Sequence, residues 1–298
     1  MSTSQQIKAD LALVAITCAW GVTFVLVQQA LSGIGPYYFI GLRFTIAFGF
    51  LALIYWKRLA QLDWSTLKAG LIIGSFLFGG YAFQTVGLKY TTVSNSGFIT
   101  GLSVVLVPIT TALLNRKPPG LITTLGVVSA TLGLGLLSLG DNLTVNLGDV
   151  LTFFSALSYA GQIILVGKYA SRHDPILLAI LQIGVVALIS MACGAVGETF
   201  PQHFTKPVRI GLLITAIPAT AIAFLVQNLV QRYTSPTHTA IIFIMEPVFA
   251  AGTAWLLTGE MLTGRQWVGC LLILAGMLVT ELKDALTSET APVKTEDT

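Results

Sequence analysis

Apolar residues in this chain gather into ten long runs, each separated from the next by a short polar stretch. A helix needs about 20 apolar residues to cross a hydrocarbon core of ~30 Å, and every run approaches that length. The sequence therefore predicts ten membrane-spanning helices, at residues 9–31, 36–56, 69–88, 93–114, 120–140, 147–167, 175–197, 208–230, 236–258 and 265–283. The first run is too long for the core of a signal peptide, so we expect it to remain as the first helix.

The pattern of the first five runs recurs in the second five. An offset of 139 residues aligns Trp20 with Tyr159, and an offset of 143 aligns Lys89-Tyr90-Thr91 with Arg232-Tyr233-Thr234. We therefore predict two repeats, residues 1–142 and 143–286. Because each repeat holds an odd number of spans, the second must enter the bilayer from the opposite side, as in the inverted repeats of secondary transporters.

Composition and charge place the chain in the membrane. Hydrophobic residues make up 54% of it and charged residues only 10%, which excludes a water-soluble surface and predicts an all-α integral membrane fold. Eleven of the sixteen lysines and arginines fall on the side that holds both termini. The positive-inside rule then puts both termini in the cytoplasm, in a multi-pass protein of the cytoplasmic (inner) membrane.

Two features follow from the same charge pattern. The net charge of +3 reflects topology, so we expect no nucleic-acid partner. Residues 287–298 are polar and cannot bury a core, and they are predicted to form a disordered cytoplasmic tail.

Arg43 and Glu246 are ionisable residues deep inside predicted spans, where a charge is expensive and usually functional. Their depths differ by about 5 Å, which is within reach of an Arg–carboxylate pair if their helices are neighbours. A structural ion pair between helices accounts for both. Alternatively, Glu246 binds substrate or carries a proton during a transport cycle.

Uncharged polar residues and breaks in the helices form a second group of candidates. Polar side chains inside spans either bond between helices or face a wet cavity. Candidate hinges are Gly79 and Gly80 in the third span, Pro218 in the eighth, and Pro247, which directly follows Glu246. The GxxxG spacings at 70–74 and 97–101 predict close helix packing.

Signatures of catalysis and cofactor binding are absent from the sequence. There is no HExxH, no P-loop, no GxGxxG after a strand and no Ser/His/Asp set. The three cysteines lie inside spans without CxxC spacing, so neither a disulfide framework nor a metal site is expected. We predict a protein that is not an enzyme, needs no cofactor and binds no ATP.

Several short motifs occur in an order that is typical of one family: Ala19-Trp20-Gly21, Leu42-Arg43-Phe44, Gly87-Leu88-Lys89-Tyr90-Thr91, Met245-Glu246-Pro247-Val248 and Gly259-Glu260. With them the chain resembles, over nearly its whole length, the drug/metabolite transporter superfamily and within it the ten-helix EamA permeases. The first half departs from the pattern, because Ser103-Val104 and Arg116-Lys117 stand where the second half has its two acidic motifs.

The resemblance implies a basket of two inverted five-helix halves around a central cavity, with the fifth and tenth spans at the periphery. The cavity candidates are Trp20, Arg43, Gln84, Asn95, Tyr159, Gln162, Gln182 and Glu246. It further implies alternating access. For a cycle driven by protons, the position of Glu246 inside a span makes it the first candidate for the proton carrier. The substrate and the lipid bilayer are the expected partners, and the oligomeric state is left open.

The sequence thus predicts a secondary active transporter that exports amino acids or related small metabolites. A multidrug exporter of the same fold is the alternative within transport. A membrane-embedded enzyme would need an acidic cluster or a His-rich loop at one interface, and a non-transporting sensor would show no solute flux.

Overall fold

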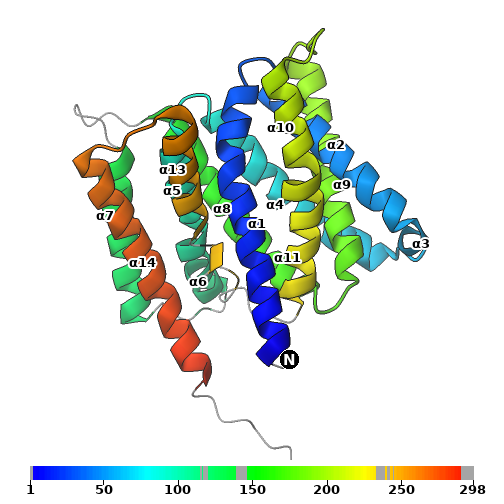
Figure 1. Ribbon diagram of the computed structural model, residues 1–298. Helices are drawn as coiled ribbons and strands as arrows, with labels where there is room; N and C mark the ends of the chain where they lie inside the picture. The colour runs from blue at the N-terminus through cyan, green and yellow to red at the C-terminus, as the bar shows by residue number, and fades with distance from the viewer. Residues whose placement is uncertain are drawn as a thin grey trace, which may run out of the picture.

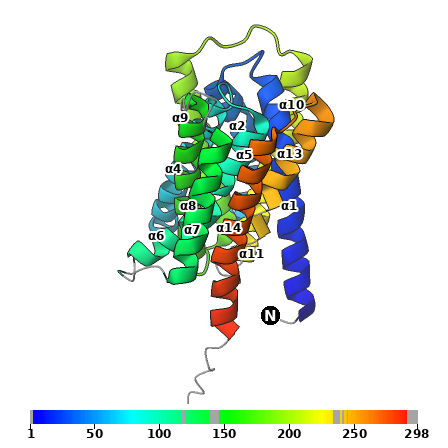
Figure 2. The same cartoon turned by 90° about the vertical axis from the view of Figure 1, so that its left-hand side faces the viewer.

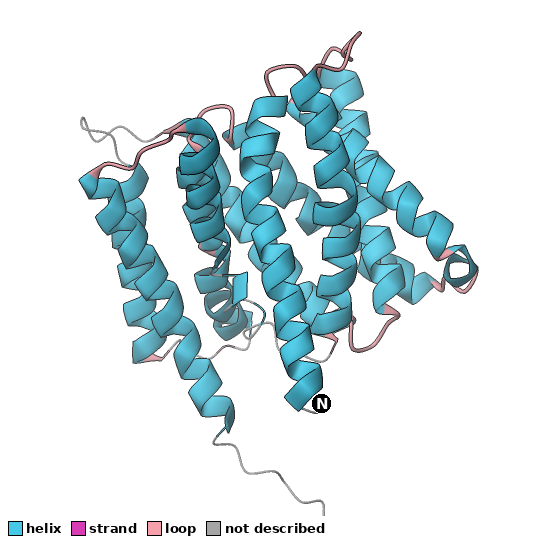
Figure 3. Ribbon diagram, viewed as in Figure 1, coloured by secondary structure: helices cyan, strands magenta, loops and turns pink. Residues whose placement is uncertain are grey.

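The computed structural model describes residues 3–114, 116, 120–138, 146–232, 239, 242–243 and 245–289, and within them every regular element is helical (Figure 3). The first half holds α1 (Thr3–Ala30), α2 (Pro36–Ile54), α3 (Trp56–Leu59), α4 (Trp64–Gly87), α5 (Val93–Gly101), α6 (Ser103–Leu114) and α7 (Leu121–Ser138). The second half holds α8 (Leu147–Tyr169), α9 (Pro175–Gly197), α10 (Lys206–Ala216), the π-helix η1 (Ile217–Ile222), α11 (Ala223–Gln231), α13 (Met245–Thr258) and α14 (Gly264–Glu289).

Seven segments of the described chain are long and apolar enough to cross a membrane. They are Lys8–Ala30, Pro36–Ile54, Trp64–Gly87, Val93–Leu114, Leu147–Tyr169, Pro175–Gly197 and Lys206–Gln231. Two shorter apolar helices, Thr124–Leu137 and Gly264–Val279, fall in the fifth and tenth predicted spans. The all-α membrane fold is therefore confirmed, while the count of ten spans and their orientation stay predictions.

The long helices form one bundle, in which α4 packs against α8 and α9, α1 against α13, and α2 against α9. Helices α7 and α14 lie side by side at one edge of the bundle (Figures 1 and 2). The start of α1 and the end of α14 lie at the same end of the bundle, which we call the N-terminal face. Helix α14 continues to Glu289, and the rest of the predicted tail lies outside the described residues.

Glycines bring α7 and α14 into backbone contact. A Cβ added to Gly133 would stand 2.6 Å from the carbonyl oxygen of Gly269, and one added to Gly276 would stand 2.5 Å from that of Gly126. The offset of 143 residues equates Gly126 with Gly269 and Gly133 with Gly276. Exchanging the two halves therefore turns one contact into the other, which is the behaviour expected of a two-fold relation.

This contact predicts that a large side chain at Gly133 destabilises the protein. Replacing Gly133 with Leu would force the helices apart, and we expect a loss of about 1–3 kcal/mol of stability, the usual effect of overpacking. The melting temperature of the purified protein in detergent would report it. Gly252→Leu is the matched control, because nothing lies within 4 Å of an added Cβ there and the residue is exposed. An unchanged melting temperature for Gly133→Leu would contradict the tight packing.

The glycine spacings predicted to pack closely do so. A Cβ added to Gly70 would clash with Leu181, and one added to Gly74 would stand 2.6 Å from Val185, so α4 packs closely against α9.

The fourth predicted span is not one helix as predicted, because it divides at Leu102 into α5 and α6. There the chain tightens, and the Leu102 amide donates to Ile99 only three residues back, at 3.1 Å.

Two carboxylates outside the spans cap helices that come from other parts of the chain. Glu198 accepts hydrogen bonds at 2.9 Å from the backbone amides of both Tyr37 and Tyr38, in the first turn of α2. Glu260 accepts one at 3.0 Å from the amide of Ser94, in the first turn of α5. Because the start of a helix carries partial positive charge, acids are stabilising there. The acid of the Gly259-Glu260 motif thus holds α5 in place.

Candidate functional site

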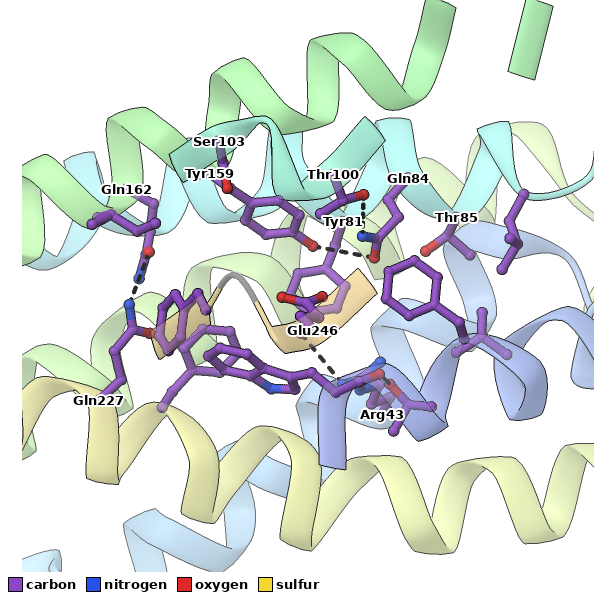
Figure 4. Close-up of a pocket in the computed structure, with 18 residues that line it drawn as sticks. Arg43, Tyr81, Gln84, Thr85, Thr100, Ser103, Tyr159, Gln162, Gln227 and Glu246 are labelled. Carbon is purple, nitrogen blue, oxygen red and sulfur yellow. Dashed lines mark hydrogen bonds between the residues drawn. The ribbon is translucent and has the colours of Figure 1, made fainter. Parts of the chain in front are cut away.

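One pocket opens between helices from both halves of the chain, with about 670 Å³ of empty space when its open side is counted. Six of the eight cavity candidates line it: Trp20, Arg43, Gln84, Tyr159, Gln162 and Glu246. They come from α1, α2, α4, α8 and α13, so the fold brings together residues more than 200 positions apart (Figure 4).

The other two candidates lie behind this lining. Gln182 is fully buried, and its side-chain oxygen accepts a hydrogen bond from the Gln162 amide at 2.9 Å. Gln162 in turn accepts one from Gln227 at 3.3 Å, which links α8, α9 and α11. Asn95 donates to Asp149 at 3.4 Å, near the start of α8. Both residues therefore hold helices together in this conformation.

Arg43 is bound by neutral acceptors. The residue is only 3% exposed, and its guanidinium donates to Thr220 Oγ1 at 2.6 Å, to the carbonyl of Ala219 at 3.2 Å and to the hydroxyl of Tyr81 at 3.3 Å. The charge also lies 4.9 Å from the centre of the Tyr81 ring, within range of a cation–π interaction. These contacts fix the guanidinium at the pocket wall and tie α2 to η1 and α4.

The acceptors on η1 exist because that part of the eighth span is not an α-helix. Pro218 has no N–H and cannot continue the regular ladder, and the chain forms a π-helix around it. The Ala219 carbonyl there accepts hydrogen bonds from both Arg43 and the indole nitrogen of Trp20, the latter at 2.9 Å. The predicted break at Pro218 thus builds part of the pocket wall.

The other hinge candidates differ from Pro218. Helix α4 runs without interruption through Gly79 and Gly80, so the structure shows no break in the third span. A Cβ on Gly80 would stand 2.5 Å from the Tyr159 ring, which means that this glycine makes room for Tyr159 at the pocket. Pro247 is the third residue of α13 and is buried against Gly97 and Gly101.

Glu246 lies in the middle of the lining residues (Figure 4). Within the described chain its carboxylate has no hydrogen bond and no ion pair, and it is not paired with Arg43 as one reading of the sequence suggested. The reason is that the Arg43 guanidinium is directed to Ala219, Thr220 and Tyr81. The pocket therefore holds a guanidinium and a carboxyl group that make no direct contact with each other.

Aromatic rings make up much of the remaining wall. Trp20 packs at 5.1 Å from Phe243 and 5.5 Å from Phe224, measured between ring centres. Tyr81 and Tyr159 pack edge to face at 5.6 Å. Such contacts are favourable between aromatic side chains and leave apolar ring faces for a ligand.

Polar atoms interrupt that apolar wall on one side. Gln84 accepts from the Tyr159 hydroxyl at 3.4 Å and donates to Thr100 Oγ1 at 3.0 Å. The pocket thus offers hydrogen-bonding groups beside the rings.

Sequence reasoning missed several of these residues. Phe224 and Phe243 carry no signal, because a phenylalanine in an apolar span is ordinary. Asp149 did have one, since it is an acid inside a predicted span, the criterion that selected Glu246. Asp149 is buried, and the hydroxyl of Thr91 donates to its carboxylate. It joins the segment between α4 and α5 to the start of α8, and it is not among the pocket-lining residues.

Known proteins are similar to this chain in sequence and in fold. The model of the EamA-like transporter family matches residues 7–139 and again residues 146–282. An "Uncharacterized transporter" of Archaeoglobus fulgidus is 36% identical over 94% of this chain and 87% of its own. A "Probable amino-acid metabolite efflux pump" of Salmonella typhimurium is 26% identical, over 89% of this chain and 91% of its own.

A solved crystal structure superposes with a TM-score of 0.69 at 18% identity, covering 94% of this chain and 98% of the other, which shows that the fold is shared. The apolar spans and these matches together identify a multi-pass membrane protein. The chain belongs to the EamA-like transporter family of the drug/metabolite transporter superfamily.

Proposed function

We propose that this protein is a secondary active transporter of the cytoplasmic membrane that exports amino acids or related small metabolites by alternating access. One observation carries the proposal: Arg43 and Glu246 line one pocket without pairing, between aromatic rings. An amino acid presents the matching groups, a carboxylate, an ammonium and a side chain. Its carboxylate would lie toward Arg43, and its ammonium toward Glu246.

The proposed architecture is ten spans in two inverted repeats, with both termini in the cytoplasm. Two separate family matches, one per half, support the duplication. The exchanged glycine contacts between α7 and α14 support a two-fold relation between the halves. The start of α1 and the end of α14 at one face are consistent with an even number of spans.

Export of an amino acid is supported by the name of the Salmonella relative, "Probable amino-acid metabolite efflux pump". Proton coupling is part of the proposal, with Glu246 as the carrier, because an acid without a partner in a membrane pocket can exchange a proton for a substrate cation. Bending would be absorbed at Pro218 in the π-helix and at Pro247, with Gly79 and Gly80 allowing α4 to flex.

The test is counterflow in proteoliposomes. Vesicles with purified protein and an excess of one unlabelled amino acid inside are exposed to a trace of the labelled compound. We expect transient accumulation for at least one amphipathic amino acid and none in protein-free vesicles. Size-exclusion chromatography checks that the purified protein is folded. If folded protein accumulates no amino acid, the amino-acid proposal is wrong.

A second candidate function is export of aromatic or cationic drugs, favoured by the rings of Trp20, Phe224 and Phe243 beside an unpaired carboxylate. The same counterflow assay with a labelled lipophilic cation decides between the two. Accumulation of the cation without that of any amino acid would establish the multidrug function. A non-transporting sensor would accumulate neither.

A further inference from the structure

The wall that α4 contributes to the pocket has a counterpart in α11. The repeated Lys/Arg-Tyr-Thr triplets follow the end of α4 and the end of α11 and are 143 residues apart. The same offset therefore aligns the residues just before each triplet. It equates three lining residues with three residues of α11: Gln84 with Gln227, Thr85 with Asn228, and Leu88 with Gln231.

The two sets differ in what they face. All three residues from α4 line the pocket, but of the three from α11 only Gln227 does. Asn228 is 0% exposed and Gln231 is 2% exposed, and neither reaches the pocket. The pocket therefore extends toward the end of α4 and stops short of the end of α11.

A second, independent observation concerns unpaired atoms near the end of α11. Among the residues that the structure describes, the side-chain oxygens of Gln227 and Asn228 have no hydrogen-bond partner, and neither has the oxygen or the nitrogen of Gln231. Buried polar atoms are nearly always paired, because leaving them dry and unbonded is costly. Three amide side chains with four unpaired atoms, all within the last five residues of one short helix, need an explanation.

Their positions supply one. Gln227 donates to Gln162, and both residues line the pocket. Gln231 lies one helical turn, about 6 Å, farther along α11. Helix α11 runs from there toward the N-terminal face (Figures 1 and 2). The three amides thus extend from the end of the pocket toward the N-terminal face.

We propose that Asn228 and Gln231 line the second half of the permeation route, which is closed in this conformation and leads from the pocket to the N-terminal face. The inference rests on the alternating-access transport proposed above. When that half opens, the unpaired amides bond water or the passing solute. Amides donate and accept without carrying charge, so such a lining suits a zwitterion and favours neither of its ends.

Site-directed labelling tests the assignment. In a variant with Cys18, Cys193 and Cys270 replaced by alanine, single cysteines are placed at Asn228, Gln231 and Leu88. A membrane-impermeant maleimide is applied from one face of oriented vesicles at a time. We expect Asn228→Cys and Gln231→Cys to react from the N-terminal face, and Leu88→Cys from the opposite face. Ile273→Cys, buried between α7 and α14, is the control that reacts from neither.

A second variant tests the role of the unpaired atoms. Gln231→Leu removes two of them and so favours the closed, dry conformation. We expect labelling of Asn228→Cys from the N-terminal face to become several times slower in this background, and labelling of Leu88→Cys to become faster. Faster labelling of Asn228→Cys would contradict the proposed role of the amides.

Labelling and flux can fail separately. If wild-type protein shows counterflow but Asn228→Cys and Gln231→Cys, folded and active, react only from the opposite face or not at all, this inference is wrong and the transport proposal stands. If the labelling pattern appears without counterflow of any amino acid, the substrate proposal fails while the second half of the route is established.

Discussion

Glu246→Gln is expected to abolish proton-driven transport and to weaken substrate binding by roughly ten- to hundred-fold. A hydrogen bond to a charged group contributes about 1.5–3 kcal/mol, and each 1.4 kcal/mol changes affinity tenfold. Glutamine has nearly the same shape but cannot ionise, so the pocket loses its carboxylate with little change in packing. Uptake driven by a pH gradient and counterflow, both in proteoliposomes, measure the two effects.

The two roles of Glu246 have different signatures. If the carboxylate only carries the proton, Glu246→Gln retains counterflow and loses accumulation driven by the pH gradient. If it also binds the substrate ammonium, counterflow falls as well, and the variant no longer prefers an amino acid over its N-acetyl derivative, which lacks the ammonium. Glu246→Asp keeps the charge and should retain part of both activities. Full activity in Glu246→Gln would remove this residue from the mechanism.

Much of the fold could be predicted because bilayer crossing leaves a strong trace in the sequence. Runs of about 20 apolar residues located the long helices to within a few residues, and the described ends of α2, α8 and α9 lie close to the predicted spans. Breaks were predicted less well. Pro218 was recognised because proline lacks an N–H, whereas the division at Leu102 has no such marker, and the glycine pair in α4 proved compatible with a continuous helix.

The pocket was predictable where a residue was out of place in a membrane. Arg43, Glu246 and the glutamines were found because polar groups in spans need a reason. Which of these side chains contact each other could not be predicted, because the depth of a residue along a helix says nothing about the direction of its side chain. Two of the three partners of Arg43 are a hydroxyl and a carbonyl on a π-helix. A carbonyl freed by irregular backbone cannot be identified from residue types.

Arg43→Leu is expected to show the second large effect, a loss of transport together with a loss of stability. The substitution removes the only positive charge among the lining residues and leaves Tyr81 without this donor at the wall. Losing a charge-assisted hydrogen bond to the substrate carboxylate would weaken binding roughly ten- to hundred-fold. The melting temperature should fall too, because α2 is no longer tied to η1.

Arg58→Gln is the matched control for this variant. Arg58 pairs with Asp174 at the surface and is 51% exposed, and an exposed pair of this kind contributes only about 0–1 kcal/mol. We expect it to leave both transport and the melting temperature nearly unchanged. Arg43→Lys keeps the charge but cannot reach Thr220, Ala219 and Tyr81 together, so it should recover only part of the activity.

Selectivity separates a binding role of Arg43 from a purely structural one. A structural defect lowers transport of every substrate by the same factor. A lost carboxylate contact instead removes the preference for an amino acid over the amine that lacks its carboxylate. Competition by the two compounds in counterflow therefore gives opposite patterns in the two pocket variants: Arg43→Leu becomes indifferent to the carboxylate and Glu246→Gln to the ammonium. If both variants keep the wild-type preferences, the two charges do not hold a zwitterion between them.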